Sequence, residues 1–120
     1  AMFEKVEVDV LGVVENMIQS RPNLKGIFSV NDGGAMGALA AIQGSGKDIK
    51  LTSVDGAPEA VKAIADGGPF IETTAQFPRD QVRVGLAMAL AKKWGARVVP
   101  KEVPIDVMPV TKKNAAGFSW

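Results

Sequence analysis

The sequence predicts a single α/β domain, a small parallel sheet with helices on both faces. Three times along the chain, an apolar run of strand length is followed by a short polar stretch and then by a helical pattern. The apolar runs do not alternate with polar residues, which is typical of strands that are buried on both faces. A length of 120 residues is enough for one compact domain but not for two.

The composition favours binding over catalysis. The chain has no Cys, which excludes disulfides, thiol catalysis and cysteine-ligated zinc, and no His, the commonest general base and metal ligand. The net charge of +1 comes from scattered Lys and Arg, so nothing indicates a nucleic-acid partner. We therefore expect a protein that is not an enzyme, with no catalytic residues, no metal site and no cofactor.

The amino-terminal segment has two patterns. Residues 3–10 alternate apolar and polar, as in a strand, but from Val10 the apolar spacing becomes helical and ends before Pro22. The pattern predicts a helix over residues 9–20 and leaves residues 4–8 undecided between strand and helix. The first clear strand is expected at residues 25–30, after a turn at Pro22-Asn23.

The stretch 26–46 sets the repeating unit of strand, polar tip and helix. Its apolar run ends at Asn31-Asp32, Gly33-Gly34 follow, and a small-residue helix runs on towards Gly44 and Gly46, where helices commonly stop. In open α/β sheets, ligands bind at the carboxyl ends of the strands. The tip at Asn31-Asp32 is therefore a candidate binding position.

The same unit occurs twice more. A run at 49–54 ends in Asp55-Gly56 and precedes a helix that begins near Pro58 and closes at 66–68. A run at 70–75 ends in Gln76-Phe77-Pro78 and precedes the longest helix, residues 79–94. The proline-containing tail, 101–110, is expected as an edge strand or an extended crossing segment. The nearest idealised form is a small flavodoxin-like open sheet.

Polar side chains follow each of the three runs: Asn31 and Asp32, then Asp55, then Gln76 with Phe77. Ends of neighbouring parallel strands are about 5 Å apart along one rim. Amide and carboxylate groups suit vicinal hydroxyls, and an aromatic ring can stack on a sugar. Each position also favours ordinary turn and helix-capping residues. Because all three tips are polar, the pattern favours a polar ligand held by Asn31, Asp55 and Gln76, with Asp32 and Phe77 as secondary candidates.

Two other patterns carry less weight. Gly44-Ser45-Gly46-Lys47 resembles part of a phosphate loop, but Ala41 replaces the earlier Gly, Asp48 replaces the Ser or Thr, and the stretch follows a helix instead of a strand. Asp32 and Asp55 could form a carboxylate pair, but no His and no third rim carboxylate accompany them.

SVNDGGAMGALAAIQGSGKDIKLTSVDGAPEAVKAIADG at residues 29–67, followed by ETTAQFP and PVTKKN, resembles the carboxyl-terminal part of a periplasmic sugar-binding protein. The chain is similar to the ribose-binding type of the ABC importer family. The resemblance implies that residues 1–120 form a single partial lobe of a two-lobe protein that closes on a monosaccharide. Asn31 of SVND, Asp55 of SVDG and Gln76 of TAQFP are the implied sugar contacts.

The resemblance also implies what lies outside this chain. The first lobe and the opening strand and helix of the second lobe are absent, as are the family's Arg contact and its ring-stacking aromatics. It places residues 5–10 in a helix and runs residues 79–94 back onto the first lobe. The implied partners are a small sugar, the missing lobe and the importer's membrane subunits. The full-length protein is expected in the periplasm, although residues 1–120 contain no signal-peptide pattern.

The alternative is the effector-binding domain of a lac-repressor-like transcription regulator, which shares the fold and binds similar ligands. Residues 70–74, FIETT, match the corresponding strand of that family poorly. A DNA-binding headpiece upstream would favour the regulator, and a signal peptide would favour the transporter.

Two further expectations concern the chain in solution. With half of the cleft missing, water competes for every hydroxyl, so sugar binding should be weak. Helix 79–94 carries apolar residues on more than one side, and leaving them bare would expose a larger patch than monomers usually tolerate. This pattern predicts a homodimer built on that helix and the tail.

Overall fold

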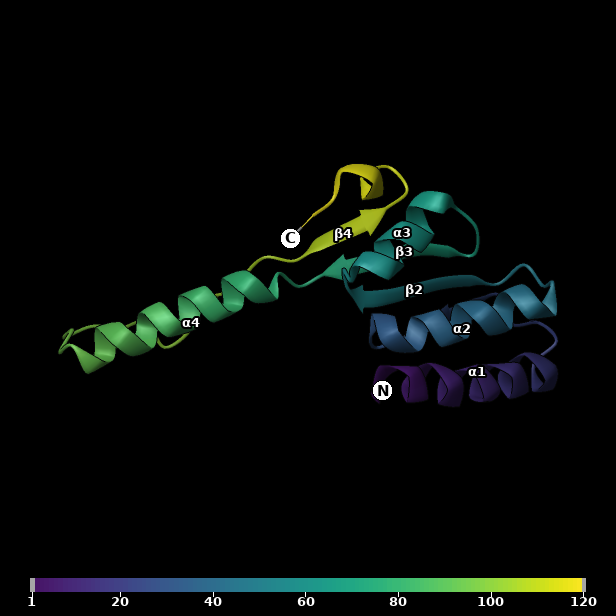
Figure 1. Cartoon of the computed structure of the whole chain (residues 1–120), viewed down its shortest axis with the longest axis horizontal. Coiled ribbons are helices and arrows are strands. Elements are labelled where there is room, and N and C mark those ends of the chain that lie inside the picture. Colours follow the sequence, from purple (N-terminus) through teal and green to yellow (C-terminus); the bar gives the residue numbers. More distant parts are fainter. Residues whose placement is uncertain (1, 120) are drawn as a thin grey trace.

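A four-stranded sheet and three packed helices make up the body of the protein, and a fourth helix projects from it (Figure 1). The structure is a computed structural model that describes residues 2–119. In chain order the elements are α1 (Met2–Ser20), β1 (Gly26–Phe28), α2 (Asp32–Ser45), β2 (Lys50–Asp55), α3 (Pro58–Asp66), β3 (Phe70–Ala75), α4 (Pro78–Lys93), β4 (Met108–Thr111) and the short 3-10 helix η1 (Ala115–Gly117).

The sheet has the order β1-β2-β3-β4. β1, β2 and β3 are parallel, and β4 adds to the β3 edge in the antiparallel direction. The α/β class and the parallel arrangement of the first three strands are confirmed. The sheet as a whole is mixed, because the tail returns to β3 from the opposite direction.

The expectation of helices on both faces is wrong for the part of the chain that the structure describes. Leu51, Phe70 and Val110 are buried on one face, whereas Phe28, on the other, is 64% exposed. The reason is the order of connection. Each step from β1 to β2 to β3 moves the same way across the sheet, and right-handed crossovers made in one direction place their helices on the same face.

Helix α1 packs against α2 and makes no comparable contact with the strands. Val14 and Ile18 of α1 are buried with α2 residues in the main core cluster. The helices approach closely at Gly37, where an added Cβ would overlap the backbone carbonyl of Glu7. Residues 4–8, undecided from the sequence, continue the helix. Packing against α2 therefore outweighs the strand-like alternation of this segment and makes it helical.

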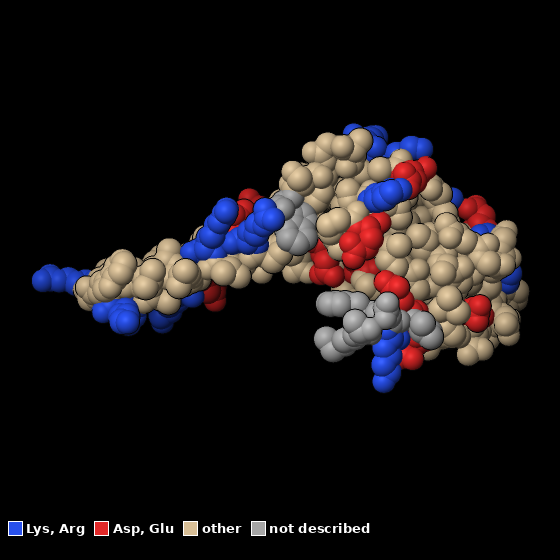
Figure 2. Space-filling view, in the orientation of Figure 1, with Lys and Arg blue, Asp and Glu red and all other residues tan. Residues whose placement is uncertain are grey.

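Residues 78–107 form a projecting arm, made of α4 and the segment that returns beside it (Figure 1). No α4 residue is buried. The radius of gyration is 18.0 Å, against roughly 14 Å for a compact chain of this length. In Figure 2, basic side chains lie along the arm, and acidic ones gather on the body near its base. No helix within residues 2–119 is long and apolar enough to cross a membrane.

Candidate functional site

The ends of β1, β2 and β3 bring the three main candidate residues together. Gln76 Nε2 donates to Asp55 Oδ1 at 3.0 Å, and the backbone N–H of Asp32, next to Asn31, donates to Asp55 Oδ2 at 3.1 Å. These two bonds join the loops that follow all three parallel strands. Asn31, Asp55 and Gln76 therefore lie along one rim of the sheet, as the strand pattern predicts.

Asn31 is the N-cap of α2. Its backbone is extended, and its Oδ1 accepts a hydrogen bond from Gly34 N at 2.7 Å. Gly34 fits here because an added Cβ would press against Ser29 Oγ and Asn31 Oδ1. Asn31 itself is exposed, and the cap uses only the oxygen of its amide. The capping interpretation is thus correct, and it leaves the Nδ2 group available to donate outward.

Asp55 occupies an unusual backbone position. Its φ is 134°, in the region that favours glycine, and Gly56 follows with φ 82°. The two carboxylate oxygens each accept one hydrogen bond from the protein, from Gln76 and from Asp32. A carboxylate oxygen can accept a second bond. Asp55 is only half-buried, so a fixed pair of acceptors faces the rim.

Asp32 has a different position from the one that the sequence predicts. The residue is 1% exposed and its side chain points into the body, where Oδ1 accepts from the hydroxyls of Ser53 and Thr73. Oδ2 accepts from Ala57 N at 2.7 Å. Asp32 therefore does not present its carboxylate at the rim. Sequence reasoning missed Ser53 and Thr73. The available signal was that both are polar residues at inward positions of otherwise apolar strands.

Gln76 and Phe77 connect β3 to the arm. The Gln76 carbonyl accepts from Gln81 Nε2 at 2.6 Å, which ties the loop to the first turns of α4. Phe77 has φ 53°, and its ring lies against Phe118 with 6.2 Å between centroids and 58° between the ring planes. The aromatic ring of Phe77 is thus half-buried and already in contact with another ring.

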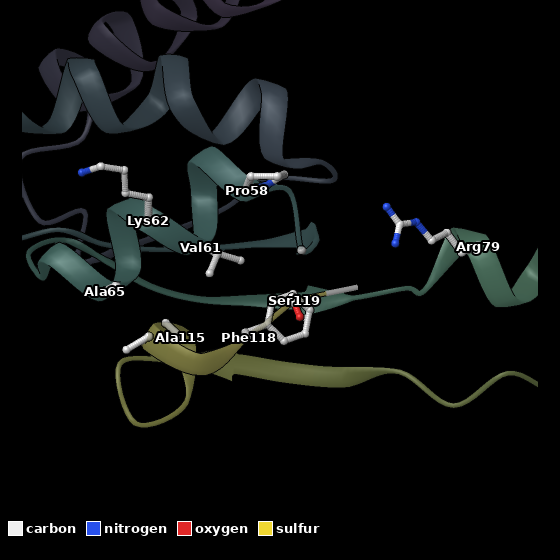
Figure 3. A pocket seen from close by; sticks show the side chains of 10 residues that line it. Pro58, Val61, Lys62, Ala65, Arg79, Ala115, Phe118 and Ser119 are labelled. Atoms are coloured by element: carbon white, nitrogen blue, oxygen red, sulfur yellow. The ribbon is translucent and has the colours of Figure 1, made fainter.

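A separate groove of about 550 Å³ runs between α3 and the carboxyl-terminal segment (Figure 3). Val61, Ala115 and Phe118 contribute apolar surface, and Lys62 and Arg79 also line it. The groove includes Gly56 but none of the three rim residues. Across residues 2–119, no group of three or more Asp or Glu side chains is placed to hold a metal ion.

Comparison with known proteins identifies the family. The family described as periplasmic binding protein domain matches residues 10–95, so the chain belongs to the periplasmic binding protein family. The ribose import binding protein of Escherichia coli (strain K12) is 34% identical over 104 residues, which are 86% of this chain and 34% of the relative. The D-allose-binding periplasmic protein of the same strain is 37% identical over 108 residues, or 88% of this chain and 33% of the relative.

Solved structures agree with the fold. A periplasmic solute binding protein of an ABC transporter from Actinobacillus succinogenes 130z, solved with bound D-allose, superposes with a TM-score of 0.85 at 27% identity. The match covers 93% of this chain and 40% of that one. This chain spans about a third of the length of the curated relatives it matches.

Proposed function

We propose that this chain is the sugar-contacting part of a solute-binding protein that delivers a small sugar to an ABC importer. The observation that carries the proposal is the rim, where Asp55 and Gln76 are hydrogen-bonded and the amide of Asn31 is exposed beside them. Two carboxylate acceptors and two amide groups on three adjacent strand ends match the vicinal hydroxyls of a monosaccharide.

The names of the relatives support transport over gene regulation. The curated relatives include import or periplasmic binding proteins named for ribose and allose, which favours this function over a lac-repressor-like effector domain. The proposed function is binding without a chemical step. Hydrogen bonds at the rim would strengthen when a second surface excludes water. A second lobe and the importer's membrane subunits are the proposed partners, and the periplasm is the proposed location of the full-length protein.

A sugar titration followed by NMR tests the proposal. In ¹⁵N-labelled chain, D-ribose or D-allose should shift the resonances of residues 29–34, 55–57 and 76–77 in fast exchange. The rim is open on one side, so we expect a Kd of about 1 mM or weaker. Glycerol at equal concentration controls for nonspecific hydroxyl effects. Shifts scattered over the body, or none at the rim, would contradict the proposal, and micromolar binding by calorimetry would contradict the expected weakness.

We also propose that isolated copies of this chain pair through the arm. Val82 and Leu86 on α4 are 69% and 58% exposed, and Trp94 at its end is 77% exposed. The open sheet face, with Phe28, is a second apolar surface on the same chain. Two copies related by a two-fold axis could each lay the arm across the other's open face.

A further inference from the structure

We infer that Asp32 is a positioning residue, whose buried carboxylate holds the loop after β2 so that Asp55 presents its two oxygens at the rim. The inference rests on the proposed function only for the ligand that Asp55 would meet. The geometry of the loop itself needs no ligand.

The Asp32 carboxylate holds the loop after β2 in two ways. Directly, Asp32 Oδ2 accepts from Ala57 N at 2.7 Å. Indirectly, Asp32 Oδ1 accepts from Thr73 Oγ1 at 2.7 Å, and Thr73 Oγ1 in turn accepts from Gly56 N at 3.2 Å. The two backbone N–H groups that immediately follow Asp55 are therefore both oriented by one buried carboxylate.

Asp32 also holds the Asp55 side chain. Its backbone N–H donates to Asp55 Oδ2 at 3.1 Å, which leaves Asp55 Oδ1 to accept from Gln76 Nε2. Asp55 is thus fixed at its side chain by one bond from residue 32 and at its following peptides by two others. These hydrogen bonds on both sides of Asp55 explain how a non-glycine residue keeps a φ of 134°.

A carboxylate suits this position better than other polar groups. All of its hydrogen-bonding partners here, namely two hydroxyls and a backbone N–H, can donate to it, and a carboxylate accepts without presenting a proton of its own. An asparagine has one oxygen and one NH2 group. Whichever way it turned, its NH2 group would face either the donor Ala57 N or the Ser53 and Thr73 hydroxyls, whose protons would then lose the oxygen that accepts them.

Ser53 provides a matched control within the same cluster. Its hydroxyl donates to Asp32 Oδ1 as that of Thr73 does, whereas it is Thr73 Oγ1 that accepts from Gly56 N. A role limited to filling the core would make Ser53→Ala and Thr73→Val equivalent. If Asp32 positions Asp55, Thr73→Val should change the conformation of Asp55 and Ser53→Ala should not.

The test measures Asp55 directly by NMR in the 120-residue chain, without ligand. Scalar couplings report whether its χ1 angle holds one value, and a through-hydrogen-bond coupling reports the contact between residue 32 N and Asp55 Cγ. We expect one χ1 rotamer and a measurable contact in the parent chain and in Ser53→Ala. We expect rotamer averaging and loss of the contact in Thr73→Val and Asp32→Asn.

Two outcomes would overturn the inference: an Asp55 that stays fixed in Thr73→Val, or one that is released equally by Ser53→Ala. Thr73→Val is nearly isosteric, so it keeps the test decisive even if Asp32→Asn does not fold. Titration of the same variants with D-ribose separates the two proposals. No sugar response in the parent chain would contradict the proposed function and leave the positioning result standing.

Discussion

Gln76 donates twice to Asp55, from Nε2 to Oδ1 at 3.0 Å and from its backbone N–H to the Asp55 carbonyl at 3.2 Å, so two hydrogen bonds join the residue that ends β2 to the one that follows β3. The same carboxylate accepts from Asp32 N on its other oxygen. Polar groups that could serve a ligand are thus already ordered by the protein before any ligand arrives. Ordering them in advance lowers the entropy cost of binding.

Substitutions at Asn31 should separate capping from ligand contact. Asn31→Ala removes the oxygen that accepts from Gly34 N and should lower the free energy of unfolding by about 1 kcal/mol. Asn31→Asp keeps a capping oxygen but loses the outward NH2 group, so its stability should stay near that of the parent while its sugar response weakens. Urea unfolding and NMR titration measure the two effects. Equal sugar responses in Asn31→Asp and the parent would exclude Asn31 as a donor to the ligand.

The strained backbone of Asp55 should make glycine the better replacement for stability. With φ at 134°, any side chain costs about 1–3 kcal/mol, whereas glycine adopts this conformation freely. Asp55→Gly should therefore unfold at higher denaturant concentration than Asp55→Ala, although both lose the carboxylate. Urea midpoints compare the two variants. A less stable Asp55→Gly would show that φ at this residue is not strained.

Gly37 should be intolerant of any side chain. Because a Cβ there would overlap the Glu7 carbonyl, Gly37→Ala should push α1 away from α2 and cost about 1–3 kcal/mol. Gly44→Ala, in the same helix but with open space around it, should instead stabilise by about 0.5–1 kcal/mol. Chemical denaturation of both variants checks the contrast, and a neutral Gly37→Ala would mean that the helices pack more loosely than described.

Pairing through the arm should be visible by light scattering. Burying a few hundred Å² of apolar surface contributes several kcal/mol at about 25 cal/mol per Å², before the cost of association. We expect a dimer at micromolar concentration and a monomer when Leu86→Asp and Leu90→Asp place charges on α4. Lys92→Asp, at an exposed polar position, is the control for charge alone. A parent chain that is monomeric at tens of micromolar would count against the dimer.

The repeated strand, tip and helix pattern predicted most of the fold because each strand ends at a polar or glycine-containing turn. The bounds expected for the third strand, 70–75, are those of β3. Local pattern could not decide residues 4–8, since what makes them helical is contact with α2, far along the chain. Nor could it show that one sheet face is open, because the side on which a helix lies depends on the order of the strands.

The site shows a similar division. Residue type and position at the strand ends were enough to choose Asn31, Asp55 and Gln76. They were not enough to separate Asn31 from Asp32, whose side chains take opposite directions because one caps α2 and the other begins it. Which of the two side chains points outward depends on the exact residue at which α2 begins. A sequence pattern cannot place the start of a helix to within one residue.

Ala75 and Met108, at the ends of β3 and β4, are register partners across the antiparallel pair. In topological terms the arm is therefore an insertion into the loop of a β-hairpin, whose two strands meet on either side of it. The hydrogen bonds of the hairpin do not depend on what the insertion touches. The body can consequently keep one folded form while the arm exchanges one neighbour for another, or is shortened to a tight turn.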